Sequence, residues 1–138
     1  MSTQTNSNMK ISEVMLGLDS FPVMPGSTIL KEALEEMGRW RLGIVCVVDD
    51  QGRLTGIFTD GDIRRKLLTV QKPFSALFVD DVQDHATDNP TTINPDSSVL
   101  EAVNIMGDKQ VWDLPVVDGN GKLVGLLHLH PVVKALMD

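Results

Sequence analysis

The sequence predicts an α/β (α+β) fold built from two tandem copies of one β-α-β-β-α unit. The chain matches itself at an offset of 69 residues, and each copy alternates β-branched runs with an amphipathic helical pattern. The clearest match aligns 47–56 with 116–125, where Val-Val-Asp precedes a glycine-containing turn. Because a unit of about 55–60 residues is only marginally stable alone, we expect the two copies to pack together with a cleft between them.

In each copy a short extended piece, at 21–24 and at 91–93, is expected to precede the first helix. Apolar residues at i, i+3, i+4 and i+7 within 30–37 give the first helix one buried face. In the second copy, Ser98 followed three residues later by Glu101 is typical of a capping box. The second helix is therefore expected to begin after Ser98.

Two strands and a closing helix complete each copy. Runs of β-branched residues and turns rich in Asp and Gly predict the strand pairs. The expected elements are strands at 44–48, 54–58, 116–117 and 123–127 and helices at 60–68 and 131–137. The connection 69–81 contains Phe74, Leu77 and Phe78, so we expect it to be partly packed.

These patterns divide the chain into repeat 1 at 10–72, a linker at 73–81 and repeat 2 at 82–138. Residues 1–9 are expected to be a flexible leader or residues left by cloning, because the polar N-terminal stretch lacks the apolar segment of a secretory signal.

Composition and charge narrow the function classes. The chain has 138 residues, 42% of them hydrophobic, and no run near the roughly 20 apolar residues that a bilayer crossing needs. A net charge of −7 argues against nucleic acid or an anionic membrane as partner. Residues 1–77 hold nine Lys/Arg against nine Asp/Glu, whereas 78–138 hold three against ten. An anionic ligand is therefore expected to prefer the first half.

Cys46 is the single cysteine, which fits a reducing cytoplasm. It lies in the apolar run 44–48, so a buried, inert side chain is expected there. The sequence contains no glycine-rich phosphate loop of the Walker or kinase type and no Cys-His pair, so no catalytic role is predicted.

The doubled pattern resembles the CBS-domain pair, or Bateman module, over about 10–138. The residues that carry the resemblance are Val14-Met15, 30–37, 47–52, 56–63 and their partners in repeat 2. Within that family, 41–43, 57–65 and 125–130 are similar to the C-terminal CBS region of arabinose-5-phosphate isomerases, where a sugar-isomerase domain precedes the pair. Residues 1–9 do not supply such a domain, so we expect a regulator or a piece of a larger enzyme.

The resemblance implies two units related by a pseudo-twofold axis, a homodimer, and clefts that bind AMP, ADP, ATP or a nucleotide sugar, with no required cofactor. It implies that Thr59 contacts phosphate, that Asp62 contacts ribose hydroxyls, and that the adenine lies near the backbone at 23–24 and 43–44. The candidate ligand-binding residues of repeat 1 are Thr59, Asp60, Gly61, Asp62, Arg64, Arg65, Val23, Met24, Gly43 and Ile44.

A structural interpretation stands beside the ligand site. Thr59 with Asp62 is also a capping pattern, and capping and ligand contact can coexist. Gly61 lets a ligand approach the backbone, and Arg64 and Arg65 add two cations just inside the helix. The apolar candidates at 23–24 and at Ile44 fit core packing equally well.

Repeat 2 departs from the family pattern, since His128 replaces the Thr position and Pro131 the Asp position. His128 and His130 alternate along an extended segment, which is a weak metal signal and leaves room for a different ligand. We expect this second site to be altered or silent. Two rival functions remain, a purely structural dimerisation module and an assembly piece of a sugar-phosphate isomerase.

Overall fold

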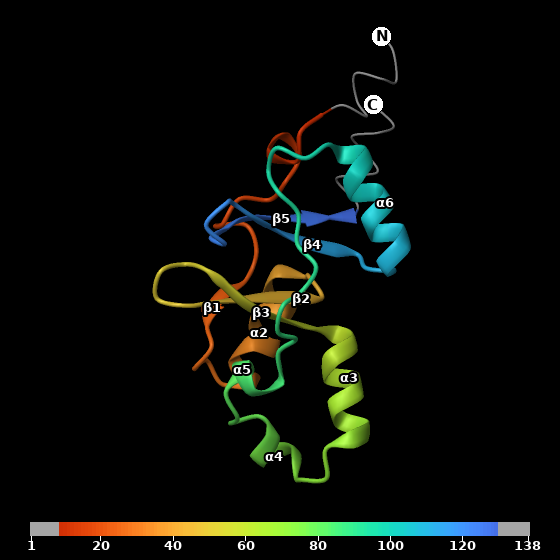
Figure 1. The fold of residues 1–138 in the computed structure, drawn as a ribbon. Coiled ribbons are helices and arrows are strands. Elements are labelled where there is room, and N and C mark those ends of the chain that lie inside the picture. The colour runs from red at the N-terminus through yellow and green to blue at the C-terminus, as the bar shows by residue number, and fades with distance from the viewer. Residues whose placement is uncertain (1–8, 130–138) are drawn as a thin grey trace. The chain divides into compact units, whose positions relative to one another are not determined.

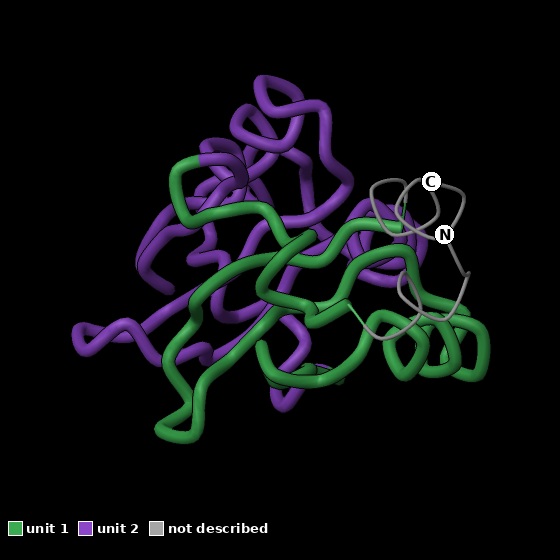
Figure 2. The backbone as a smooth tube through the Cα atoms, turned by 90° about the horizontal axis from the view of Figure 1, so that it is seen from above, with its two compact units in different colours: residues 1–19, 91–138 green, residues 20–90 purple. Residues whose placement is uncertain are grey.

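The computed structural model describes residues 9–129, and its contacts divide the chain into two compact units (Figure 2). The central unit is 20–90. The terminal unit combines the two ends of the chain, described here at 9–19 and 91–129. The units therefore differ from the sequence repeats, because the first ten residues of repeat 1 fold with repeat 2.

The central unit is built on a three-stranded sheet in the order β1-β2-β3 (Figure 1). Its strands are β1 (Val23–Pro25), β2 (Ile44–Val48) and β3 (Leu54–Thr59). β1 is parallel to β2, and β3 is antiparallel to it, with Ile44 opposite Thr59. A parallel pair needs a crossover connection, and the helix between β1 and β2 provides it.

Four helices belong to the central unit: α2 (Leu30–Trp40), α3 (Asp60–Thr69), α4 (Phe74–Leu77) and α5 (Val82–His85). The first two were predicted, whereas α4 and α5 are too short to leave a periodic pattern. The connection between the repeats is partly packed as predicted, because Leu77 is fully buried while Phe74 is exposed and stacks on Phe78.

Asp80 anchors this connection. Its Oδ2 accepts a hydrogen bond from Lys72 Nζ at 2.6 Å and lies 2.8 Å from His85 Nε2. The hydrogen bonds from Lys72 and then from His85 hold the pKa of Asp80 below the usual value of an aspartate. The backbone carbonyl of Asp80 also accepts a hydrogen bond from Leu30 N, so the connection satisfies an otherwise orphaned donor at the start of α2.

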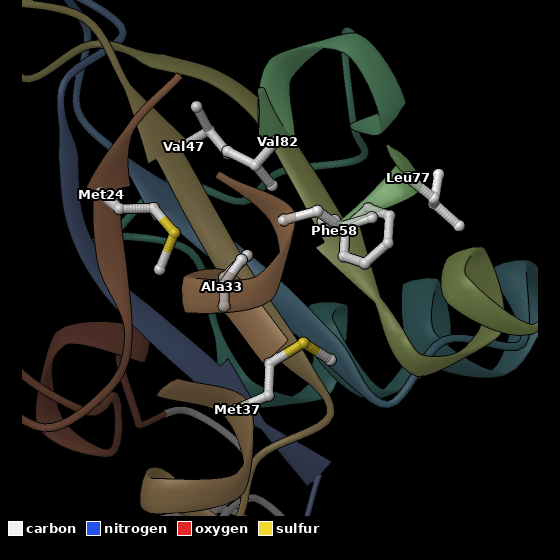
Figure 3. Close-up of a cluster of buried hydrophobic side chains, with 9 residues drawn as sticks. Met24, Ala33, Met37, Val47, Phe58, Leu77 and Val82 are labelled. Carbon is white, nitrogen blue, oxygen red and sulfur yellow. The ribbon is translucent and has the colours of Figure 1, made fainter. Parts of the chain in front are cut away.

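The core of the central unit lies between the sheet and the helices (Figure 3). The predicted helix face is buried, and side chains from α2, α4, α5 and both long strands meet there. The buried members are Met24, Leu30, Ala33, Met37, Val45, Val47, Phe58, Leu77 and Val82. Cys46 is buried too, as its apolar run predicted.

In its described residues, the terminal unit has a two-stranded antiparallel sheet and one long helix. Its elements are η1 (Ile11–Glu13), α6 (Val99–Lys109), β4 (Asp113–Val117) and β5 (Leu123–His128). The helix begins as predicted, with Ser98 Oγ accepting a hydrogen bond from Glu101 N at 3.1 Å. In place of the expected strand at 91–93, Ile93 forms a single parallel bridge to Val116. The helix expected at 131–137 lies outside the described residues.

Matching backbone details support the internal repeat. The left-handed residue that ends α2 is Arg41, and its counterpart after α6 is Gln110. The turn glycines Gly52 and Gly121 both have φ of +80°. Each hairpin also carries a register shift at the same place. Within the described part of the chain, no helix combines the length and apolarity that a membrane crossing requires.

Candidate ligand-binding site

Four predicted residues meet at one end of the central sheet, where β2 begins and β3 ends. Ile44 pairs with Thr59 across the two strands. Asp60 N donates to Gly43 O at 3.0 Å. A Cβ at Gly43 would lie 2.6 Å from Asp60 Oδ2, so only glycine lets the Asp60 carboxylate lie this close to the strand. The turn from strand to helix is thereby held tight.

The capping interpretation of Thr59 and Asp62 is confirmed. Asp62 N donates to Thr59 Oγ1 at 3.2 Å, and Thr59 N donates to Asp62 Oδ2 at 2.9 Å. The Thr59 hydroxyl also donates to Asp62 Oδ2 at 3.0 Å. Asp62 is only 8% exposed, so these bonds satisfy a nearly buried carboxylate at the start of α3.

The two arginines of α3 have different surroundings. Arg65 Nη2 donates to Asp62 Oδ1 at 2.5 Å, and its guanidinium lies beside Gly61. Both oxygens of Asp62 thus have protein partners: Oδ2 accepts two hydrogen bonds, whereas Oδ1 accepts one and retains a free lone pair. Arg64 is exposed and makes no side-chain hydrogen bond or ion pair within the described residues. It is therefore the cation at this corner that is available to an anion.

The residues expected near the adenine, Val23 and Met24, line a separate hollow of about 420 Å³. Its other lining residues come from the turn before α2 and from α2 itself: Thr28, Glu32, Glu35 and Glu36. Met24 and Ile44 are 6% and 1% exposed as whole residues, which places them in the core and leaves little of either residue open to a ligand. The glutamates make this hollow unsuitable for phosphate but acceptable to a neutral ring.

A second hollow, which the sequence did not predict, lies at the opposite end of the sheet. It has a volume of about 350 Å³ and is lined by Pro25, Gly26, Ser27, Val48, Asp49, Asp50, Gln51, Thr55 and Gln83. Gln83 Oε1 accepts a hydrogen bond from the Thr55 hydroxyl at 3.0 Å. Gln83 could not be singled out from the sequence, because its hydrogen-bond partner Thr55 is 28 residues away along the chain.

In repeat 2, His128 ends β5 opposite Asp113, the first residue of β4. His128 Nδ1 lies 2.7 Å from Asp113 Oδ1, a contact that the sequence did not predict. His130 lies outside the described residues. Among the residues that the structure describes, no group of three His, Cys, Asp or Glu side chains is arranged to hold a metal ion.

The chain is similar in sequence to arabinose 5-phosphate isomerases. The chain is 35% identical over 130 residues to arabinose 5-phosphate isomerase KdsD of Pseudomonas aeruginosa, and 32% identical over 126 residues to the isomerase GutQ of Escherichia coli K12. These matches cover 92% and 91% of this chain. The chain spans only 38% of the length of either isomerase.

Solved structures share the fold. CBSX2 in complex with AMP has a TM-score of 0.82 at 27% identity, covering 93% of this chain and 96% of that one, and CBSX2 is an Arabidopsis thaliana protein. A CBS domain-containing protein of Bacillus anthracis has a TM-score of 0.85 at 16% identity, covering 99% and 98%. The family model of the CBS domain matches residues 11–69 and again 79–138. The chain therefore belongs to the CBS domain family and carries a tandem pair of these domains.

Proposed function

We propose that this CBS pair senses an adenine nucleotide, such as AMP, ADP or ATP, or a nucleotide sugar, and that its central unit holds the phosphate beside Arg64. The observation that carries the proposal is the exposed guanidinium of Arg64, which has no side-chain partner in the described chain and lies in the first turns of α3. The AMP bound to the similar protein CBSX2 supports the ligand class.

The charges at the corner favour a ligand with few phosphates. The backbone N–H groups at the start of α3 and the Arg64 side chain attract an anion. Asp60 and Asp62 lie in the same turn and repel additional negative charge. We therefore expect AMP to bind more tightly than ATP, with Asp62 accepting a ribose hydroxyl through the remaining lone pair of Oδ1.

The second candidate function is assembly of a sugar-phosphate isomerase without any ligand. This function is favoured by the similarity to arabinose 5-phosphate isomerases, since the chain matches only 38% of the length of such an enzyme. Exposed apolar side chains at Leu68, Phe74 and Val79 also suit a dimer interface. A homodimer and a cytoplasmic location are part of both proposals.

A thermal-shift measurement on the 138-residue chain tests the ligand proposal. AMP at 100 times its Kd stabilises the folded state by about 2.7 kcal/mol, which raises Tm by roughly 5–10 °C. Arg64→Ala is expected to weaken AMP binding at least about tenfold, the size of one charge-assisted contact. Arg53→Ala is the matched control, because Arg53 is an exposed arginine before β3, at the other end of that strand.

Each result has a consequence. A Tm unchanged by AMP, ADP, ATP and a nucleotide sugar at millimolar concentration would reject the ligand proposal and leave assembly as the function. An equal loss of affinity in Arg64→Ala and Arg53→Ala would show that binding depends on net charge and not on this corner. The ligand-induced shift of Asp62→Ala must be measured against its own ligand-free Tm, because Asp62 also caps α3.

A further inference from the structure

The hollow of about 350 Å³ lies at the carboxyl ends of the two parallel strands of the central sheet. Pro25 ends β1 and Val48 ends β2, and both residues line the hollow. In open α/β sheets, ligands bind in the crevice outside the carboxyl ends of the strands. The corner proposed for the nucleotide lies where β2 begins, at the other end of that strand, so this hollow is a separate place.

Hydrogen-bond acceptors dominate the lining of the hollow. The Thr55 hydroxyl donates toward Val47 O at 3.1 Å and Gln83 Oε1 at 3.0 Å, so the lone pairs of Thr55 Oγ1 remain for a donor. Gln83 Oε1 also keeps one lone pair. Asp50 is exposed, and its carboxylate has no partner within the described residues. A ligand for this hollow must therefore be rich in donors.

The Gln83 amide is held in position before any ligand arrives. Its Nε2 donates to Asp88 Oδ1 at 3.2 Å and to Thr55 O at 3.4 Å. A Cβ at Gly26 would lie 2.9 Å from Gln83 Oε1, so the glycine leaves the space that the amide occupies. Polar groups whose orientation is fixed in advance bind a ligand with less loss of freedom.

The terminal unit has the same backbone arrangement at the equivalent place. Gln83 N donates to Gly26 O at 3.2 Å, and in the terminal unit Ser12 N donates to Pro95 O at 3.0 Å. These residues correspond through the repeat offsets of 71 and 69. The segment that contains Gln83 is therefore attached to its unit by a backbone bond that does not require the amide side chain.

The polar groups of the hollow are absent from the terminal unit. The residue equivalent to Thr55 is Val124, and the residue equivalent to Asp50 is Gly119. Both units nevertheless form the same hairpin with the same register shift. The hydroxyl, the amide and the free carboxylate are thus not needed for the fold, which leaves them available for binding.

The charges around the hollow exclude an anion. Among the residues that line it there is no Lys, Arg or His, and both charged members are aspartates. The adjacent start of α2 offers no replacement, because Leu30 N and Lys31 N already donate to backbone carbonyls of the connection 78–80. A phosphate would therefore meet repulsion without any compensating donor.

We propose that this hollow binds a small uncharged compound with several hydroxyl groups, a sugar or a polyol, and rejects its phosphate esters. The hydroxyls of the ligand donate to Thr55, Gln83 and Asp50. The Ser27 hydroxyl and the Gln51 amide, which also line the hollow, donate to the ligand in return. The volume is at the lower end of the range for small-molecule pockets, which suits a single sugar. This site is independent of the proposed nucleotide site.

The test is an NMR titration of the ¹⁵N-labelled 138-residue chain with ribose, sorbitol and ribose 5-phosphate, each to about 100 mM at pH 7. Ribose or sorbitol is expected to shift the amide signals of 26–28, 49–51 and Gln83 in a saturable way. A Kd of about 1–10 mM is the range for a ligand of about ten non-hydrogen atoms. Ribose 5-phosphate should bind at least about tenfold more weakly, because the aspartates repel it.

Two variants separate the roles of the lining residues. Thr55→Val, which introduces the side chain found at Val124, should weaken ribose binding by about three- to tenfold. Asp50→Asn should reduce the preference for ribose over ribose 5-phosphate. Asp108→Asn is the matched control, because it makes the same charge change at an exposed position of α6 and should alter neither affinity. Arg64→Ala should also leave ribose binding unchanged, even if it abolishes AMP binding.

Several results would overturn the proposal. They are the absence of a saturable shift with ribose and sorbitol, an equal affinity for ribose and ribose 5-phosphate, or ribose binding that neither Thr55→Val nor Asp50→Asn alters. Ribose-induced shifts confined to 59–65 would move the ligand to the nucleotide corner and reject this hollow. The ligand-free spectrum of each variant shows whether it is folded, and Asp50→Asn keeps the test decisive because Asp50 is an exposed turn residue.

Discussion

Asp62 is the residue on which both the helix α3 and the proposed nucleotide site depend. Its carboxylate caps the helix through Thr59 and also pairs with Arg65. A nearly buried carboxylate with three hydrogen-bond donors is more strongly held than the single hydroxyl that caps α6. Removing the Asp62 carboxylate therefore lowers the stability of the folded chain, whether or not a ligand is bound.

Asp62→Ala is expected to lower the free energy of unfolding by about 1–2 kcal/mol, because the capping bonds and the pairing with Arg65 are lost together. Ser98→Ala removes the single cap of α6 and should cost about 1 kcal/mol or less. Urea denaturation of both variants measures the difference. If Asp62→Ala were no less stable than the wild type, the bonds at this corner would be energetically irrelevant.

The sequence predicted the bonds that lie within one helical turn and not those that depend on the sheet. Thr59 and Asp62 are three residues apart, so the capping pattern is visible in the chain itself. His128 and Asp113 are 15 residues apart and meet only because the hairpin register makes them opposite.

At the scale of elements, the connection between the repeats depends on one carboxylate. Asp80 links Lys72 to His85 and, through its backbone, to the start of α2. Its pKa in the folded state is depressed by these partners. A depressed pKa contributes stability above the pKa of the unfolded state, about 3.9 for aspartate, and this contribution is lost as the pH falls through the folded value.

Asp80→Asn should therefore be less stable than the wild type near neutral pH, and the difference should shrink as the pH falls below about 4. Asp81→Asn is the control, since Asp81 is an exposed neighbour whose side chain makes no capping bond. Thermal unfolding of both variants from pH 3 to 7 provides the measurement. A difference that stayed constant over this range would contradict the assignment of Asp80 as the group responsible.

Two glycines of the terminal unit should respond oppositely to alanine. A Cβ at Gly125 would lie 2.8 Å from the backbone oxygen of Leu16, so Gly125→Ala must displace the segment that crosses β5. We expect a loss of about 2 kcal/mol or more. Gly107 lies within α6 with nothing near its Cβ, so Gly107→Ala should gain about 0.5–1 kcal/mol. Chemical denaturation measures the free energy of unfolding of both variants. If both substitutions raised it, or both lowered it, this prediction would be contradicted.

The long elements were predicted because their patterns are long enough to show a period. The apolar face of α2 and the strand at 44–48 were located within a residue or two. β4 begins three residues before the predicted strand. The sequence pattern missed this start because Pro115 is unusual within a strand. The carbonyl of Pro115 nevertheless accepts a hydrogen bond from Ile93 N. Four-residue helices such as α4 and α5 carry no period to detect.

At the scale of the whole molecule, the first segment of each sequence repeat pairs with the sheet formed by the other repeat. Leu16 forms a bridge with Leu126, and in the central unit Thr87 forms the equivalent bridge with Ile57. The sequence showed that 11–15 matches 82–86, but a repeat pattern does not say which sheet a segment joins. The reciprocal exchange is therefore a feature that only the structure supplies.

Ile11 tests this exchange, since it is fully buried in the core of the terminal unit. Ile11→Ala should cost about 2–4 kcal/mol, and hydrogen exchange should rise in 91–129 more than in 20–90. Leu30→Ala is the matched control, because Leu30 is equally buried in the central unit and should produce the opposite pattern. Faster exchange confined to 20–90 in Ile11→Ala would contradict the division into these units.

The exchange of first segments also sets an order of events during synthesis on the ribosome. The segment at 82–90 follows the central sheet directly, so that unit is complete as soon as it has emerged. Leu16 must wait for Leu126, about 110 residues later, which at a translation rate of about 5–20 residues per second is a delay of roughly 5–20 s. During that interval Leu16 has no partner strand, whereas the central unit already has all of its segments.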